Sequence, residues 1–143
     1  MDAAIQSFVH GFDNFLISTL AAGLLLVVSC VVYVILTPMK EMELLRNGNA
    51  SAGLGLAGVI IGLTIPIASA LATSLSLFDL LIWGVVALLI QLLSFRVVDL
   101  ILKDLPKRIE NDEAGAAIVL IAVKISTAMI VGAALWVPAP VMQ

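Results

Sequence analysis

Four long runs of hydrophobic residues divide the chain, and short polar stretches separate them. The runs cover about Phe15–Leu36, Ala50–Ala72, Asp79–Leu102 and Ala114–Val137. Each run reaches the roughly 20 residues that an α-helix needs to cross a hydrocarbon core of about 30 Å. In lipid every backbone polar group must be satisfied internally, and the sequence lacks the alternation typical of strands. The pattern therefore predicts an all-α integral membrane protein with four transmembrane helices.

Composition supports this prediction and limits the function. The chain has 143 residues, of which 62% are hydrophobic and 12% charged, whereas soluble domains have about 25% charged residues. We expect one membrane domain over residues 1–143, with the lipid bilayer as its surroundings and no nucleic-acid partner. No nucleotide-binding loop, zinc spacing or Ser/His/Asp set is present. The sequence therefore predicts no enzyme, no catalytic residue, no metal site and no cofactor.

The basic residues predict an orientation. Five of the seven lie in two polar stretches, namely Lys40, Arg46, Lys103, Lys107 and Arg108. By the positive-inside rule both stretches are cytoplasmic, so both termini should face the periplasmic side of a bacterial inner membrane. We interpret the two stretches as solvated linkers of mixed charge. Arg46, Lys107 and Arg108 are candidate contacts to anionic lipid headgroups, each contributing about 1 kcal/mol near the surface.

The two halves of the chain, about residues 12–73 and 78–138, share one pattern. Both begin with Phe-Asp, at Phe12-Asp13 and Phe78-Asp79, and both continue as an apolar run, a charged stretch and a Gly/Ala-rich run. Each half crosses the membrane twice, so the two copies have the same orientation. The pattern predicts two helical hairpins related by a parallel internal repeat.

Three motifs carry a resemblance to a known family. They are Gly48-Asn49-Ala50, the run from Gly62 to Pro66, and Trp83 together with Gln91. In these motifs, and over nearly its whole length, the chain resembles the YjfL-like family of small bacterial inner-membrane proteins, which have a duplicated two-helix domain of unknown function. The resemblance implies four helices and the bacterial inner membrane, and it implies no reaction.

Small residues and one proline mark the helix faces. Gly58 and Gly62 form a GxxxG pair in the second run, and Ala128 and Gly132 have the same spacing in the fourth. Such residues let helix backbones approach closely, either within one chain or between the chains of a homo-oligomer. Pro66 should kink its helix and free a carbonyl near Gly62, and Thr64 or Ser69 could satisfy local backbone groups.

Charged residues inside the apolar runs are the candidate functional site. Lys124 lies about 15 Å into the fourth run, where a lysine costs about 2.5–3.5 kcal/mol. Arg96 and Asp99 lie about 9 Å and 5 Å into the third run, on one helix face, and Gln91 precedes them. On depth alone Asp99 is the carboxylate within reach of Lys124, so we predict one network of Gln91, Arg96, Asp99 and Lys124. In the first half, Tyr33 stands at the position that matches Asp99 and Ile60 at the position that matches Lys124, so the halves are not equivalent.

Two classes of function remain open. The chain could be a subunit of a small ion channel or transporter, in which case four helices would need an oligomer to enclose a path, and a basic path would favour anions. Alternatively, it could be a structural or accessory membrane protein that packs with or recruits a membrane or cytoplasmic protein partner, without transport.

Overall fold

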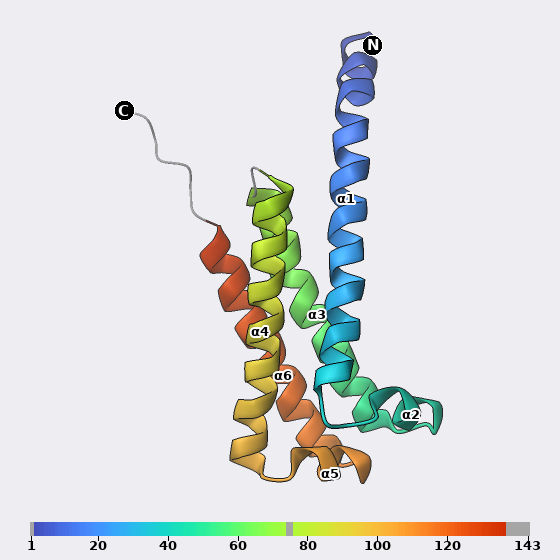
Figure 1. Ribbon diagram of the computed structural model, residues 1–143, viewed down its shortest axis with the longest axis vertical. Helices are drawn as coiled ribbons and strands as arrows, with labels where there is room; N and C mark the ends of the chain where they lie inside the picture. Colours follow the sequence, from blue (N-terminus) through green and yellow to red (C-terminus); the bar gives the residue numbers. More distant parts are fainter. Residues whose placement is uncertain (1, 74–75, 137–143) are drawn as a thin grey trace.

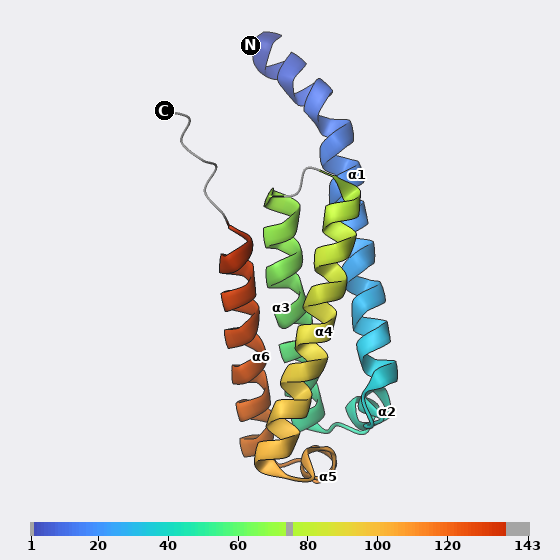
Figure 2. The ribbon, with the colours of Figure 1, turned by 60° about the vertical axis from the view of Figure 1, so that its left-hand side comes forward.

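The computed structural model describes residues 2–73 and 76–136, and all regular structure in these ranges is helical. Four long helices form the bundle: α1 (Asp2–Leu36), α3 (Ala50–Thr73), α4 (Leu77–Leu102) and α6 (Ala114–Leu135). Two short helices, α2 (Glu41–Arg46) and α5 (Leu105–Glu110), connect them in pairs at one end of the bundle (Figure 1). The first residues of α1 and the end of α6 lie toward the other end (Figures 1 and 2).

The four long helices confirm the prediction of an all-α integral membrane protein. Segments long and apolar enough to span a membrane run over Gly11–Leu36, Ala50–Thr73, Leu77–Leu102 and Ala114–Leu135. Helix α1 begins at Asp2, well before the predicted start, and projects beyond the other helices (Figure 1). The predicted end of the fourth span, Val137, and residue 138, the predicted end of the second repeat, lie outside the described residues.

Small residues hold the centre of the bundle together. Helix α3 packs most extensively on α6. A methyl group built on Gly58 would lie 3.0 Å from Ile121 of α6, and one on Gly132 would lie 2.9 Å from Ile65 of α3. Ala128 is also buried. These faces are therefore used inside the chain, because close backbone approach supplies the packing that apolar side chains cannot gain in lipid. They do not offer a free surface for a second copy.

The interpretation of the two charged stretches as solvated linkers was wrong. Glu41 of α2 is buried, and so are Leu105 and Ile109 of α5. Leu105 and Ile109 pack with Phe95 and Leu120 in an apolar cluster at this end of the bundle. Helices of six residues are too short to be stable alone, so burial of these side chains against the long helices stabilises them.

The Gly48-Asn49-Ala50 motif joins the two halves. The side-chain amide of Asn49 donates to the carbonyls of Ile109 (2.9 Å) and Glu110 (3.2 Å). Its Oδ1 accepts from the backbone N–H of Ala52 (2.7 Å), and Asp112 Oδ1 accepts from that of Ser51 (2.7 Å). The bonds to Ala52 and Ser51 satisfy backbone N–H groups at the start of α3, which have no partner within the helix. Gly48, the first residue of the motif, supplies the left-handed turn before α3, at φ 82°.

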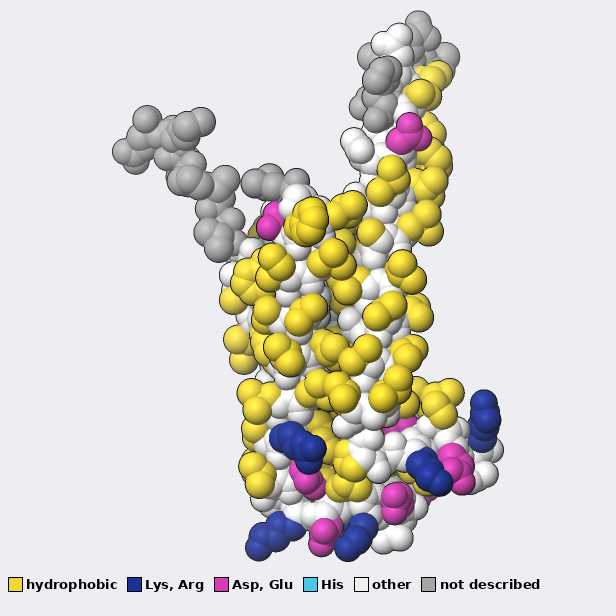
Figure 3. Space-filling view, viewed as in Figure 1, with side chains coloured by type: hydrophobic (Ala, Val, Ile, Leu, Met, Phe, Trp, Pro, Cys, Tyr) yellow, Lys and Arg dark blue, Asp and Glu magenta, His cyan; other side chains and the backbone are white. Residues whose placement is uncertain are grey.

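Charge and apolar surface are segregated along the molecule. In Figure 3 hydrophobic side chains cover the long helices, while most of the charged side chains gather at the end that carries α2 and α5. The exposed apolar side chains include Leu24 at 66% and Ile130 at 69%. Such a surface suits contact with lipid tails and would not be stable in water.

Candidate functional site

Lys124 is the centre of a buried polar site. Its side chain is 0% exposed, although it carries an amine in the middle of α6. The amine, Nζ, donates to the backbone carbonyl of Gln91 on α4 (3.3 Å). It also lies 4.2 Å from the centre of the Tyr33 ring on α1. A cation over a desolvated aromatic ring gains about 2 kcal/mol, so the ring replaces part of the lost hydration.

Gln91 links Lys124 to the kink of α3. Pro66 has no N–H, so it leaves the carbonyl of Gly62 without its helical donor. The Gln91 side chain donates to that carbonyl (3.1 Å) and to the carbonyl of Lys124 (3.3 Å). A methyl group on Gly62 would lie 2.6 Å from the Gln91 amide, so only glycine leaves room for it. The distant Gln91 thus supplies the partner of this carbonyl, while Thr64 donates to a local backbone group, the carbonyl of Ile60 (2.7 Å), as predicted.

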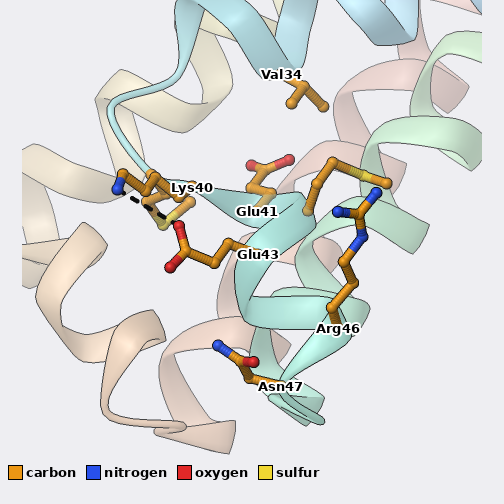
Figure 4. Close-up of a pocket in the computed structure, with 8 residues that line it drawn as sticks. Val34, Lys40, Glu41, Glu43, Arg46 and Asn47 are labelled. Atoms are coloured by element: carbon orange, nitrogen blue, oxygen red, sulfur yellow. Dashed lines mark ion pairs between the residues drawn. The ribbon is translucent and has the colours of Figure 1, made fainter.

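Glu41 brings a carboxyl group to the same region. It lies in the first turn of α2, is 2% exposed, and interacts electrostatically with Lys124 and Tyr33. Burial raises the pKa of Glu41 to about 7, against the opposing influence of the Lys124 charge and of a hydrogen bond from Thr37. Glu41 also lines a surface pocket of about 490 Å³ at the end of α1 (Figure 4). Glu41 therefore both borders this pocket and acts electrostatically on the buried amine.

Three buried polar atoms around this site have no hydrogen-bond partner among the described residues. They are the Tyr33 hydroxyl, Gln91 Oε1 and Glu41 Oε2. Leaving such a group unpaired costs about 1–3 kcal/mol, and most buried polar groups in proteins are paired. The Tyr33 hydroxyl and the Glu41 carboxyl group can each exchange a proton, whereas the Gln91 amide oxygen can only accept a hydrogen bond.

The predicted pairing of Lys124 with Asp99 is not found. Asp99 Oδ1 instead accepts the backbone N–H of Leu105 (2.9 Å), next to the start of α5. Arg96 is exposed on the outer side of α4, away from the buried face that carries Gln91. Lys124 instead contacts Gln91, and Asp99 lies about two turns farther along α4 than Gln91. Of the four predicted residues, the structure brings together Gln91 and Lys124 only.

The three predicted headgroup residues differ in their surroundings. Arg108 pairs with Glu113 (2.6 Å) and donates to the carbonyl of Leu102. Lys107 lies 3.8 Å from Asp104 on an exposed surface. Arg46 is exposed, and no ion pair holds it within residues 2–73 and 76–136.

Sequence reasoning missed Glu41 and the contact of Tyr33. Glu41 is one of four charged residues in a polar stretch, where a solvated position is the ordinary expectation. The available signal was the apolar Met39, Leu44 and Leu45 around it, which indicate that part of this stretch packs on the bundle. Tyr33 was singled out only as the counterpart of Asp99 in the first half.

With the fold and the site described, comparison with known proteins places the chain. Residues 7–135 match the family model described as "Domain of Unknown Function (DUF350)". The chain belongs to this family. It is also 38% identical over 85 residues to the UPF0719 inner membrane protein YjfL of Escherichia coli K12, and equally to that of Escherichia coli O157:H7. The match covers 59% of this chain and 64% of each relative, which is less than two thirds of their length. No solved structure matches.

Family membership confirms the resemblance and leaves the chemistry to the structure. The description of the family states no activity. The buried site of Lys124, Tyr33, Gln91 and Glu41 is therefore the feature on which a function can be argued.

Proposed function

We propose that this chain is a subunit of an ion channel or transporter of the bacterial inner membrane, in which protonation of Lys124 and Glu41 accompanies ion passage. The observation that carries the proposal is the buried amine of Lys124, which has no carboxylate within ion-pair distance among the described residues. Ionisable residues inside membranes are costly and commonly mark ion or proton pathways. A purely structural role would favour a direct partner for the charge.

The position of Glu41 supports proton exchange in particular. Its carboxyl group lines the pocket and acts electrostatically on Lys124. Because the pKa of Glu41 is about 7, the group gains and loses a proton near neutral pH. A proton from the aqueous side can therefore reach the neighbourhood of the Lys124 amine by way of Glu41.

The proposed path requires more than one subunit. Gly58 and Gly132 bring α3 and α6 so close together that a single added methyl group would meet Ile121 or Ile65 at about 3 Å. No space for an ion remains at these contacts. The path would then pass between copies of the chain, along faces other than the small-residue faces.

The same close packing favours a second candidate function. A bundle whose central helices are in tight contact, with two short helices folded onto one end, also suits an accessory protein that recruits or stabilises a partner. In that case α2 and α5 would form the docking surface, and the charges at Lys124 and Glu41 would serve the fold. We propose no enzymatic activity for either candidate.

We further propose that α2 and α5 face the cytoplasm and that both termini face the periplasm. The positive-inside rule supports this orientation, since all basic residues outside the spans lie at the α2 and α5 end.

Reconstitution in liposomes tests the proposal. A pH-sensitive dye inside the vesicles should report proton entry with the unmodified protein, and Lys124→Met should lower the rate to that of empty vesicles. Lys107→Met, which removes an exposed lysine, should keep the rate. Folded protein that moves no ions, tested with proton, potassium and chloride gradients, would overturn the transport proposal and favour the accessory role.

A further inference from the structure

An apolar groove runs along the outer face of the bundle between α1 and α3. It has a volume of about 490 Å³. Helix α1 contributes Leu26, Cys30 and Val34, α3 contributes Leu56 and Ile60, and α2 contributes Met42. These positions lie within the membrane-spanning parts of α1 and α3, apart from Met42. The groove therefore faces the hydrocarbon region, where an acyl chain is the available occupant.

The groove continues into a charged pocket. Val34 and Met42 line both the groove and the pocket at α2. The other residues of that pocket include two cations, Lys40 and Arg46, and two acids, Glu41 and Glu43. The combined site is apolar along the span and charged where the span ends. This is the order of groups in a phospholipid, from acyl chain to headgroup.

Arg46 is the cation available to a ligand in this pocket. Lys40 is already paired with Glu43 (3.4 Å), and Figure 4 shows this pair on the other side of Glu41 from Arg46. Arg46 has no such pair among the described residues. Guanidinium groups bind phosphate oxygens through two parallel hydrogen bonds, so Arg46 suits a phosphodiester better than a lysine would.

We propose that this groove and pocket bind one glycerophospholipid molecule, with an acyl chain between α1 and α3 and its phosphate at Arg46. The bound lipid would fill the loosely packed side of the bundle and join α1 to α2. The site does not depend on ion transport, so it stands or falls separately from the proposed function.

Native mass spectrometry of the full chain tests the proposal. Delipidated protein is titrated with phosphatidylethanolamine or phosphatidylglycerol. We expect one tightly retained lipid, and Arg46→Gln should weaken its binding roughly tenfold, as expected for the loss of a charge-assisted hydrogen bond. Ile60→Trp should also lower retention by filling the groove. The matched controls are Lys103→Gln, an exposed lysine outside the pocket, for charge and Ile130→Trp for an exposed apolar position on α6.

Cys30 gives a second measurement that does not depend on mass spectrometry. It is the single cysteine of the chain, half-buried in the groove. In lipid nanodiscs its rate of modification by N-ethylmaleimide should rise in Arg46→Gln and stay unchanged in Lys103→Gln. Equal retention and equal thiol reactivity in both variants would overturn the proposal. So would equal loss of lipid from Arg46→Gln and from the controls, because that result means only non-specific lipid contact. Binding of inorganic phosphate or of glycerophosphoethanolamine with the same affinity would exclude the acyl groove.

Discussion

Lys124 and Glu41 place an amine and a carboxyl group in one buried region, without a direct ion pair between them in the described part of the chain. The ring of Tyr33 and the carbonyl of Gln91 surround the amine instead. Removing a charge from water costs several kcal/mol, and these contacts offset only part of that cost. The stability of the folded protein therefore depends on whether each of these two groups is protonated.

The pH dependence of stability tests the environment of Glu41. Its pKa is raised from 4.5 to about 7 in the folded state, so between these values the folded protein binds more protons than the unfolded one. Stability should be greatest below about pH 4.5 and fall as the pH rises through 7. The loss is about 3 kcal/mol for a shift of this size. Thermal unfolding in detergent between pH 5 and 8 measures it, and Glu41→Gln should remove the dependence.

Glu43→Gln is the matched control for this measurement. Glu43 lies two residues away on the same helix but is 62% exposed and paired with Lys40. Its replacement should leave the pH profile unchanged. An identical profile in the unmodified protein and in Glu41→Gln would mean that Glu41 is hydrated in the folded state.

At single residues the sequence predicted the unusual groups better than their partners. The cost of a lysine in lipid singled out Lys124, and the missing N–H of Pro66 singled out the carbonyl of Gly62. Their partners depend on which way each side chain points, which depth alone does not give. Asp99 contacts Leu105 at the end of α4, whereas Gln91, two turns earlier on the buried face of α4, reaches both Gly62 and Lys124.

At the level of elements, the kink of α3 and the side chain of Gln91 form one unit. Gln91→Met alone leaves the Gly62 carbonyl unpaired and should cost about 1–3 kcal/mol. In a Pro66→Ala background the restored N–H can donate to that carbonyl, so the same change should cost at least about 1 kcal/mol less. A double-mutant cycle of unfolding in mild detergent measures this coupling.

Asp99→Ala combined with Pro66→Ala is the control cycle. Asp99 contacts the backbone of Leu105 and not the kink, so these two changes should add within about 0.5 kcal/mol. Additive costs for Gln91 and Pro66 as well would show that the glutamine does not replace the missing helical donor.

The long elements could be predicted, and the short ones could not. An apolar run of about 20 residues has one stable form in lipid, so the four spans followed from length and composition. Helices α2 and α5 depend on buried contacts between distant parts of the chain, such as the packing of Ile109. Because these stretches carry charges of both signs, their sequence indicated solvated linkers rather than this packing. The bonds from Asn49 to the carbonyls of Ile109 and Glu110 likewise arise only once the two halves meet.

Across the whole molecule, the two halves share one order of elements but divide the chemistry between them. Each has a long helix, a six-residue helix and a Gly/Ala-rich helix. The second half supplies Gln91 and Lys124, and the first supplies Tyr33 and Glu41. The site therefore lies between the halves and forms only when both fold together, which a single hairpin could not achieve.

The orientation of the molecule is the last prediction, and it follows from charge. Every Lys and Arg outside the spans lies at the end with α2 and α5. If that end stays in the cytoplasm, none of these charged side chains has to cross the membrane during insertion. A reporter active only in the cytoplasm should give no signal when fused after Gln143 and a strong signal when fused after Asn47, between α2 and α3. A reporter active only in the periplasm should show the reverse pattern. Signal from the cytoplasmic reporter at Gln143 and none at Asn47 would invert the orientation, and the Glu41 pocket would then face the periplasm.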